Sequence, residues 1–411
     1  MKVYCNKVIT TILLIIFLSF PCTSSEENSD ENISPPDSYR WTTYTTAHFV
    51  LYYIPIEEDE FHGACDEEII AGGKYLEESY YDAINLGFPL DDRYLKRHDL
   101  EPSIVPIDGQ VYKHKIHVYL FNFDREYVYA YTVSIGDPQK KGERMGSYIY
   151  VNTVPCSYMC RNSHMYLSLL KSTLKHEYFH VIQNSCYDVL EDLWWSEATA
   201  EWFAIRKDPA LIREKLTRLL SAPDKSLDDK EDIDRPYDSS IFPLYLEEID
   251  KKLIEDIWEN CIISQSFEAI DKVLSDRGGL KKVFEEFALE HVTQKMPYYH
   301  MRGKTDIEVK TVKISEKKNI IKGKLPHLSA RYYKFTDRDT FKITGIEGIN
   351  RKNGGVYLIQ KQKNNDFKII NILNSRINGI NVSGKNSSEL FLVVINSGVK
   401  PYPVDYKITI E

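Results

Sequence analysis

The sequence predicts an α+β region followed by an all-β sandwich, because the character of the chain changes twice along its length. Up to about residue 154, short stretches rich in β-branched and aromatic residues flank one helical stretch. Helical patterns dominate residues 166–292, and short strands between Gly-, Asn- and Asp-rich turns follow from about residue 303. We therefore expect a mixed sheet with a helical C-terminal subdomain over residues 40–302, and a β-sandwich accessory domain over 303–411.

The first 25 residues have the pattern of a secretory signal peptide. Lys2 and Lys7 precede the apolar run VITTILLIIFLSF at residues 8–20, and small residues follow it. The run is short for a membrane span, and no second apolar segment of spanning length follows. We expect removal of residues 1–25, a disordered acidic leader at 26–39 and a secreted or extracytoplasmic protein. An uncleaved signal anchor is the alternative.

If the protein is exported, its cysteines can form disulfide bonds. Five remain after removal of the signal peptide, and in an oxidising compartment they could form two disulfides and leave one thiol. We favour a disulfide for at least one of Cys156 and Cys160, because no second Cys or His pair completes a zinc site with them. The other three are Cys65, Cys186 and Cys261. The sequence leaves the pairing open.

The individual elements follow from hydrophobic periodicity. The expected strands of the first region are 48–54, 115–123 and 146–154. The expected helices are 67–86, 166–186, 193–205, 209–221, 241–260, 266–275 and 279–292. In the tail, the expected strands are 332–335, 340–346, 354–361, 366–373, 389–396 and 405–410.

The net charge of the chain argues against nucleic acid as a partner. The whole chain carries a net charge of −9, which gives no electrostatic basis for binding nucleic acid. Residues 306–411 carry 19 Lys and Arg against 10 Asp and Glu, so this tail is basic and the rest of the chain is acidic. The tail could attach weakly to an anionic cell surface, although solvated lysine-rich strand faces are the simpler interpretation. We expect a monomer.

Residues 175–183, KHEYFHVIQ, place two histidines one helical turn apart. His176 and His180 would share one helix face, where two imidazoles can bind one Zn²⁺. Glu177 projects about 100° round the helix from His176, beside the metal rather than on it. From there it could take a proton from a water molecule at the metal. The alternative is an ordinary surface helix on which these polar residues occur by chance.

The helix expected at 193–205 supplies the missing parts of such a site. A catalytic zinc needs a third protein ligand and one open position. Glu197 lies 17 residues after His180, and the small residues 198–200 would let two helices approach closely. Glu201 falls one turn further on, where it could hydrogen-bond the outer nitrogen of a histidine. Glu201 could instead be the third ligand, because it also begins an E-x-x-A sequence.

H-E-x-x-H followed by a helix with E-x-x-A resembles the gluzincins, the thermolysin-like and membrane-alanyl-aminopeptidase-like zinc peptidases. The resemblance is local, covering about 30 residues from His176 to Glu201. It implies a zincin-like catalytic domain in which His176, His180 and Glu197 bind zinc and Glu177 is the general base. Glu201 would replace the supporting aspartate that lies four residues after the third ligand in thermolysin-like enzymes. The order of strand, two motif helices and β-sandwich also resembles uncharacterised secreted metallopeptidases of bacteria and archaea.

We therefore expect a secreted zinc metallopeptidase that acts on a peptide or protein substrate. The oxyanion donor is left open among five residues, with Tyr237 the first to test: Tyr237, His291, Tyr298, Tyr299 and His300. The strand at 146–152 would present an edge to which the substrate could add by backbone pairing. Two alternatives stay open: a catalytically inactive zincin-fold binding or adhesion protein, and a zinc hydrolase acting on a non-peptide substrate.

Overall fold

The structure is a computed structural model that describes most of the chain after residue 39. The described residues are 40–59, 63–100, 110, 112–122, 128–135, 145–153, 164–187, 193–300, 306–314, 318–336, 340–374, 380–383 and 387–411. The expected signal peptide and leader lie outside them, as do Cys156 and Cys160. Within the described residues, no helix combines the length and the apolar character needed to cross a bilayer.

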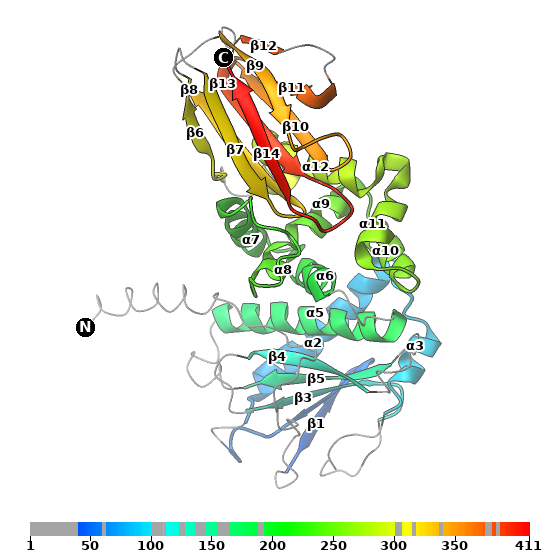
Figure 1. Ribbon diagram of the computed structural model, residues 1–411. Coiled ribbons are helices and arrows are strands. Elements are labelled where there is room, and N and C mark those ends of the chain that lie inside the picture. Colours follow the sequence, from blue (N-terminus) through cyan, green and yellow to red (C-terminus); the bar gives the residue numbers. More distant parts are fainter. Residues whose placement is uncertain are drawn as a thin grey trace, which may run out of the picture. The chain divides into compact units, whose positions relative to one another are not determined.

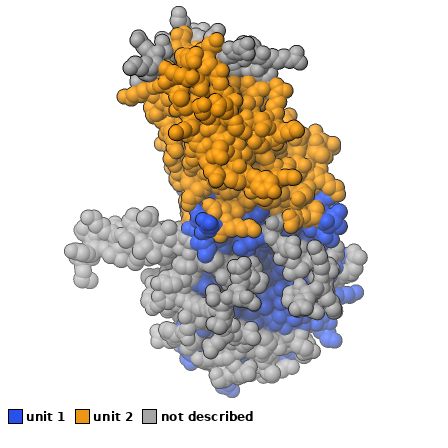
Figure 2. Space-filling model, in the orientation of Figure 1, with its two compact units in different colours: residues 1–207, 231–240, 254–263 blue, residues 208–230, 241–253, 264–411 orange. Residues whose placement is uncertain are grey.

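The chain forms two compact units, coloured separately in Figure 2. Unit 1 contains residues 1–207, 231–240 and 254–263, and unit 2 contains 208–230, 241–253 and 264–411. The helical segments after residue 207 are thus divided between the units, and several belong with the C-terminal strands. The expected domain limits, 40–302 and 303–411, stay a prediction.

Unit 1 is built on a mixed five-stranded sheet. Its strands are β1 (Thr42–Thr45), β2 (Phe49–Tyr53), β3 (Ile116–Phe121), β4 (Ala130–Ile135) and β5 (Gly146–Asn152), in the order β1-β2-β3-β5-β4. The three central strands run parallel, and both edge strands are antiparallel to their neighbours. Every residue of β2, β3 and β5 is buried, which explains why these strands read as nearly continuous apolar runs. The three strands expected from the sequence are confirmed.

One expectation about this sheet is wrong. The strand at 146–152 does not present an edge, because β5 pairs with β3 on one side and with β4 on the other. The edge strand is β4, which the sequence pattern did not reveal. Its burial falls along its length to the exposed Ser134 and Ile135, so its hydrophobic pattern is weaker than that of the buried strands.

Helices cover one face of this sheet. Those of unit 1 are α2 (Asp66–Asn85), α3 (Asp92–Arg97), α5 (His164–Cys186), α6 (Leu193–Ile205), α8 (Arg235–Asp238) and α10 (Leu253–Cys261), the last from residue 254 onward. Figure 1 shows α2 and α5 side by side above the strands. The ring of Tyr178 on α5 meets Phe49 of β2 edge to face, with ring centroids 5.4 Å apart. This packing fixes α5 above the sheet.

The opposite face of the sheet is a cluster of aromatic residues. Tyr52 stacks on Tyr119 with ring centroids 4.7 Å apart, and Tyr119 lies 5.3 Å from Tyr150 on the next strand. Such ring pairs add about 0.5–1.5 kcal/mol each beyond the burial of their area. The cluster comprises Trp41, Val50, Tyr52, Ile54, Tyr119, Phe121, Tyr148 and Tyr150. It makes the sheet a rigid platform for α5.

Unit 2 contains the expected β-sandwich together with helices. One sheet has the order β11-β10-β13-β8-β6 and the other the order β12-β9-β14-β7. The strands are β6 (Lys310–Lys313), β7 (Asn319–Leu325), β8 (Ser329–Thr336), β9 (Thr340–Glu347), β10 (Gly354–Gln362), β11 (Phe367–Asn371), β12 (Ile380–Ser383), β13 (Ser387–Asn396) and β14 (Val404–Ile410). Its helices are α7 (Pro209–Ser221), α9 (Ile241–Ile249), α11 (Ser266–Val273), α12 (Gly279–Thr293) and α13 (Pro297–His300). The chain is therefore a mixed α/β protein with several sheets.

Helix α12 covers the outer face of the first of these sheets. Leu392 and Val394 of β13 point into the sandwich core, so Val393 and Ile395 point outward, and yet both are fully buried. Tyr332 of β8 donates a hydrogen bond of 2.8 Å to the carbonyl oxygen of Ala288 on α12. The central strands β13 and β8 of this sheet are thus covered on both faces.

The single helix expected over 241–260 is two helices, α9 and α10. The Asp250 carboxylate accepts a 3.1 Å hydrogen bond from the backbone N–H of Lys252. A local bond of this kind competes with helix continuation and ends α9. Periodicity alone did not reveal the break, because the apolar pattern resumes in phase with Leu253.

A buried histidine ties α3 to β5 and α5 in unit 1. The Ser147 N–H donates to His98 Nδ1 at 3.3 Å, and His98 Nε2–H donates to the Ser185 hydroxyl at 3.0 Å. That hydroxyl in turn donates to the Met145 carbonyl oxygen at 3.0 Å. The chain of bonds holds a neutral ring, and burial lowers the pKa of His98 to about 3.

We predict that this ring makes the protein less stable in acid. Between the unfolded pKa near 6.5 and the folded value, the unfolded state binds the extra proton, so the free energy of unfolding falls as pH falls. The slope attributable to His98 approaches about 1.4 kcal/mol per pH unit below pH 6. Urea unfolding between pH 7.5 and 4.5 should show this slope in wild type and lose it in His98→Gln, whose amide can keep both hydrogen bonds. Parallel pH profiles for the two proteins would contradict the prediction.

Candidate metal centre

The two histidines of α5 point to one place. His176 and His180 lie one turn apart, and their Nε2 atoms are 3.0 Å from each other. Both residues are buried. Helix α5 can present two polar rings inside the protein because the residues between and around them, such as Tyr178 and Phe179, pack on the sheet and on α6.

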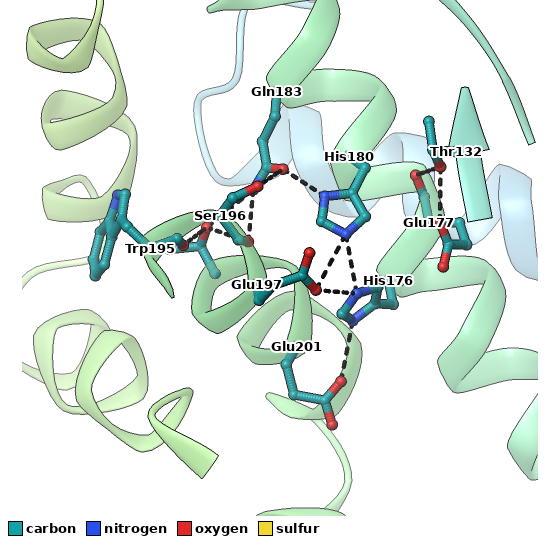
Figure 3. A network of polar contacts seen from close by, with 10 residues as sticks. Thr132, His176, Glu177, His180, Gln183, Trp195, Ser196, Glu197 and Glu201 are labelled. Atoms are coloured by element: carbon teal, nitrogen blue, oxygen red, sulfur yellow. Dashed lines mark hydrogen bonds and ion pairs between the residues drawn. The ribbon is translucent and has the colours of Figure 1, made fainter. Parts of the chain in front are cut away.

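Helix α6 brings Glu197 to the same place, as Figure 3 shows. One carboxylate oxygen, Oε2, lies 3.2 Å from His176 Nε2 and 3.5 Å from His180 Nε2. Ala198 and Ala200 beside it are fully buried, in keeping with the expectation that small residues let the helices approach. His176, His180 and Glu197 form a buried group that could hold a metal ion.

The outer nitrogens of both rings are also engaged. His176 Nδ1–H donates to Glu201 Oε2 at 3.1 Å, and His180 Nδ1–H donates to Gln183 Oε1 at 2.7 Å. Glu201 thus lies on the side of His176 away from Glu197, where the sequence predicted a supporting residue. This placement favours Glu197 over Glu201 as the third ligand.

The orientation of the Gln183 amide is fixed by α6. Its Nε2 donates to the Ser196 carbonyl oxygen at 3.0 Å and to the Thr199 hydroxyl at 3.1 Å, while the Ser196 hydroxyl donates to its Oε1 at 2.8 Å. Gln183 Oε1 can therefore only accept from His180. The hydrogen bonds determine which ring nitrogen carries the proton.

Three acceptor atoms consequently face one another. With Nδ1 protonated, each neutral ring presents an Nε2 lone pair, and Glu197 adds a carboxylate oxygen. At separations of 3.0, 3.2 and 3.5 Å these atoms repel unless a positive charge lies between them. Tetrahedral coordination at about 2.0–2.1 Å spaces two ligand atoms about 3.3 Å apart. The residues therefore fit a metal ion with three protein ligands.

Protons occupy these lone pairs when no metal is bound. Burial alone would lower the pKa of His176, but the carboxylates of Glu197 and Glu201 outweigh it and raise the value to about 10. Burial likewise opposes ionisation of Glu197, but the two histidines lower its pKa to about 2. Glu197 thus stays ionised, and protons compete with a metal ion for the two imidazole nitrogens.

Glu177 lies beside this group rather than in it. Its carboxylate accepts a 2.8 Å hydrogen bond from the Thr132 hydroxyl of the edge strand β4. The residue is 4% exposed, and burial raises the pKa of its carboxyl group. A buried carboxylate next to a metal position is suited to accepting a proton near neutral pH.

Tyr237 is the one expected oxyanion donor that unit 1 contains. Its ring stacks on that of His176, with centroids 5.7 Å apart and planes 22° from parallel. It reaches the site on α8, which begins at Arg235 and has Pro236 in its first turn. The remaining candidates belong to unit 2. There His291 and Tyr299 form a 2.5 Å hydrogen bond with each other inside the unit.

Sequence reasoning missed four residues of this network: Thr132, Gln183, Ser196 and Thr199. Gln183 had a readable signal, since it follows His180 by three positions on the same helix face. Ser196 and Thr199 flank Glu197 in sequence, yet nothing in the pattern links them to Gln183. Thr132 is 45 residues from Glu177, and only the fold brings them together.

Comparison with known proteins assigns no family to the chain. No protein-family model matches it, and no curated protein matches it. Solved structures match over 25% of the chain. The Salmonella Typhimurium periplasmic inhibitor of g-type lysozyme matches with 16% identity, 97% of its own length and a TM-score of 0.19. The pre-peptidase C-terminal domain of Bacillus anthracis collagenase matches with 14% identity, 95% of its length and a TM-score of 0.18. TM-scores this low support no conclusion on fold or function.

We predict that removing Glu197 costs more metal affinity than removing Glu201. Glu197→Gln replaces an anionic ligand by a weak neutral one. Glu201→Gln keeps an amide oxygen that can accept from His176 Nδ1–H and removes only the negative charge behind the ring, so its loss of affinity should not exceed the 10–100-fold that is typical of supporting residues. Competition with a chromogenic chelator for Zn²⁺ measures both. Glu259→Gln tests the second described group that could hold an ion, the carboxylates of Glu255, Asp256 and Glu259 on α10, and should leave the affinity unchanged. A larger loss of affinity for Glu201→Gln would indicate that Glu201, and not Glu197, is the third ligand.

Proposed function

We propose that the protein is a secreted zinc metallopeptidase. The observation that carries the proposal is the meeting of three acceptor atoms, from His176, His180 and Glu197, beside the buried carboxylate of Glu177. Three protein ligands and an adjacent base are the parts of a hydrolytic zinc site. The local resemblance to gluzincins supports peptide bonds as the substrate.

Each residue of the site would have a distinct part in hydrolysis. Bound zinc would polarise the scissile carbonyl and acidify a water molecule. Glu177 accepts the proton of the attacking water and delivers it to the leaving nitrogen, so the carboxylate is regenerated in each cycle. Glu201 and Gln183 keep the histidines in the tautomer that leaves Nε2 free for the metal. In this role they orient the ligands and exchange no proton.

Tyr237 is our choice for the oxyanion donor. The stacking of its ring on His176 places it against a ligand of the site. Its phenolic O–H can donate to the oxygen on which negative charge develops as the carbonyl is attacked. Since the ring is only partly buried, solvent and substrate have access to it.

The edge strand β4 offers a place for an extended peptide. It pairs on one side with β5 and ends the described sheet on the other. Thr132 connects it to Glu177, so a peptide paired along β4 would lie near the base. Attachment of the basic tail to an anionic cell surface and a monomeric state belong to the same proposal.

The two alternative functions are a binding or adhesion protein and a hydrolase with another substrate. A binding or adhesion protein with a structural metal site has no need of a buried carboxylate at Glu177, which argues for the enzyme. A zinc hydrolase with a non-peptide substrate would use the same residues. The expected cleavage of peptides separates these candidates.

We predict that Glu177→Gln abolishes hydrolysis and keeps the metal. The amide is isosteric but cannot take a proton, so kcat should fall roughly 10²–10⁴-fold. Peptide release from a denatured casein substrate, measured beside zinc content by atomic absorption, tests this. Absence of zinc from the purified wild-type protein would refute the proposal. Equal peptide release by wild type and variant would assign the cleavage to a contaminant.

For Tyr237→Phe we predict a loss of kcat of roughly 10²–10³-fold with little change in KM, because one oxyanion donor is removed and the stacked ring is kept. Steady-state kinetics on a fluorogenic peptide distinguish this from a binding defect. Full activity in the variant would exclude Tyr237 as the donor.

A further inference from the structure

One residue of another element hydrogen-bonds the carboxylate of Glu177 in the part of the chain that the structure describes. Within the described residues, its side chain has one hydrogen bond, the 2.8 Å bond from the Thr132 hydroxyl. The same hydroxyl lies 3.0 Å from the Glu177 backbone oxygen. The histidines on either side direct their rings to the metal position instead. Among the described residues, the hydrogen bond that orients the base thus comes from another element, the strand β4.

The strand geometry directs Thr132 toward α5. Side chains alternate between the two faces of a strand. Tyr131 and Val133 pack against the aromatic cluster on one face, so Thr132 between them points to the other face, where α5 lies. A β-branched residue also has a restricted side-chain rotamer. Both effects help to hold the hydroxyl in place, together with its 3.0 Å contact to the Glu177 backbone oxygen.

Without this bond the base would lose its orientation. A glutamate side chain has three rotatable bonds, and fixing it costs conformational entropy. Proton transfer requires heavy atoms within about 2.6–3.2 Å in the correct geometry. A carboxylate free to change rotamer would spend much of its time outside that range.

We propose that Thr132 is a positioning residue that holds Glu177 for proton transfer. The inference rests on the proposed function and extends it to the edge strand. Thr132 neither gains nor loses a proton in the reaction; its hydroxyl remains a hydrogen-bond donor to Glu177 throughout. Because Thr132 lies on β4, the strand that would pair with a peptide also sets the position of the base.

The test compares Thr132→Val with Thr132→Ser. Valine keeps the shape and the strand preference but lacks the hydroxyl, whereas serine keeps the hydroxyl. We expect Thr132→Val to lower kcat roughly 10–100-fold, the range for lost supporting bonds, with KM and zinc content unchanged. Thr132→Ser should recover most of the wild-type kcat. A rise in KM, a loss of zinc or equal defects in both variants would show a merely structural role and overturn the proposal.

A second measurement does not depend on catalysis. Acetohydroxamate chelates the metal and donates its hydroxyl proton to a neighbouring carboxylate, so its affinity reports the position of Glu177. Titration of the Co²⁺-loaded protein, followed by visible absorption, should show roughly tenfold weaker binding for Thr132→Val. Unchanged binding would overturn the inference. If wild type binds metal and hydroxamate but cleaves no peptide, the proposed function fails and this titration alone decides the role of Thr132.

Discussion

The site rests on one electrostatic constraint, the close approach of three atoms that all carry lone pairs. Two imidazole nitrogens and a carboxylate oxygen between 3.0 and 3.5 Å apart require a positive charge among them. A metal ion supplies that charge, and in its absence protons do. The packing of α5 against α6 holds these atoms at that distance despite their repulsion. Aromatic and small residues between the two helices provide this packing.

The supporting bonds differ between the two histidines. His176 donates to a carboxylate, Glu201, and His180 donates to a neutral amide, Gln183. A carboxylate makes the ring more basic and adds negative charge, whereas an amide fixes the tautomer without adding charge. Gln183 also hydrogen-bonds Ser196 and Thr199 on α6. The ligand geometry and the packing of the two helices are therefore stabilised by the same bonds.

In the sheet of unit 1, the strand that contacts the site lies at the edge. The parallel strands in its centre are buried on both faces and provide rigidity, with stacked tyrosines on the side away from α5. The antiparallel β4 closes the described sheet and carries a hydroxyl to Glu177. Polar function is thus confined to a strand at the edge of the described sheet, where a peptide could pair.

The order of residues was enough to predict the local parts: the spacing of His176, Glu177 and His180 on one helix, the small residues after Glu197, and nearly all long helices and buried strands. These depend on periodicities of 3.6 and 2 residues, which can be recognised from residues that are close together in the sequence. Tertiary structure decided which carboxylate approaches the Nε2 atoms, which strand forms the edge, and that Thr132 and Tyr237 reach α5. Those contacts join residues 21 to 61 positions apart. Their geometry depends on how whole helices and strands pack, which no local pattern encodes.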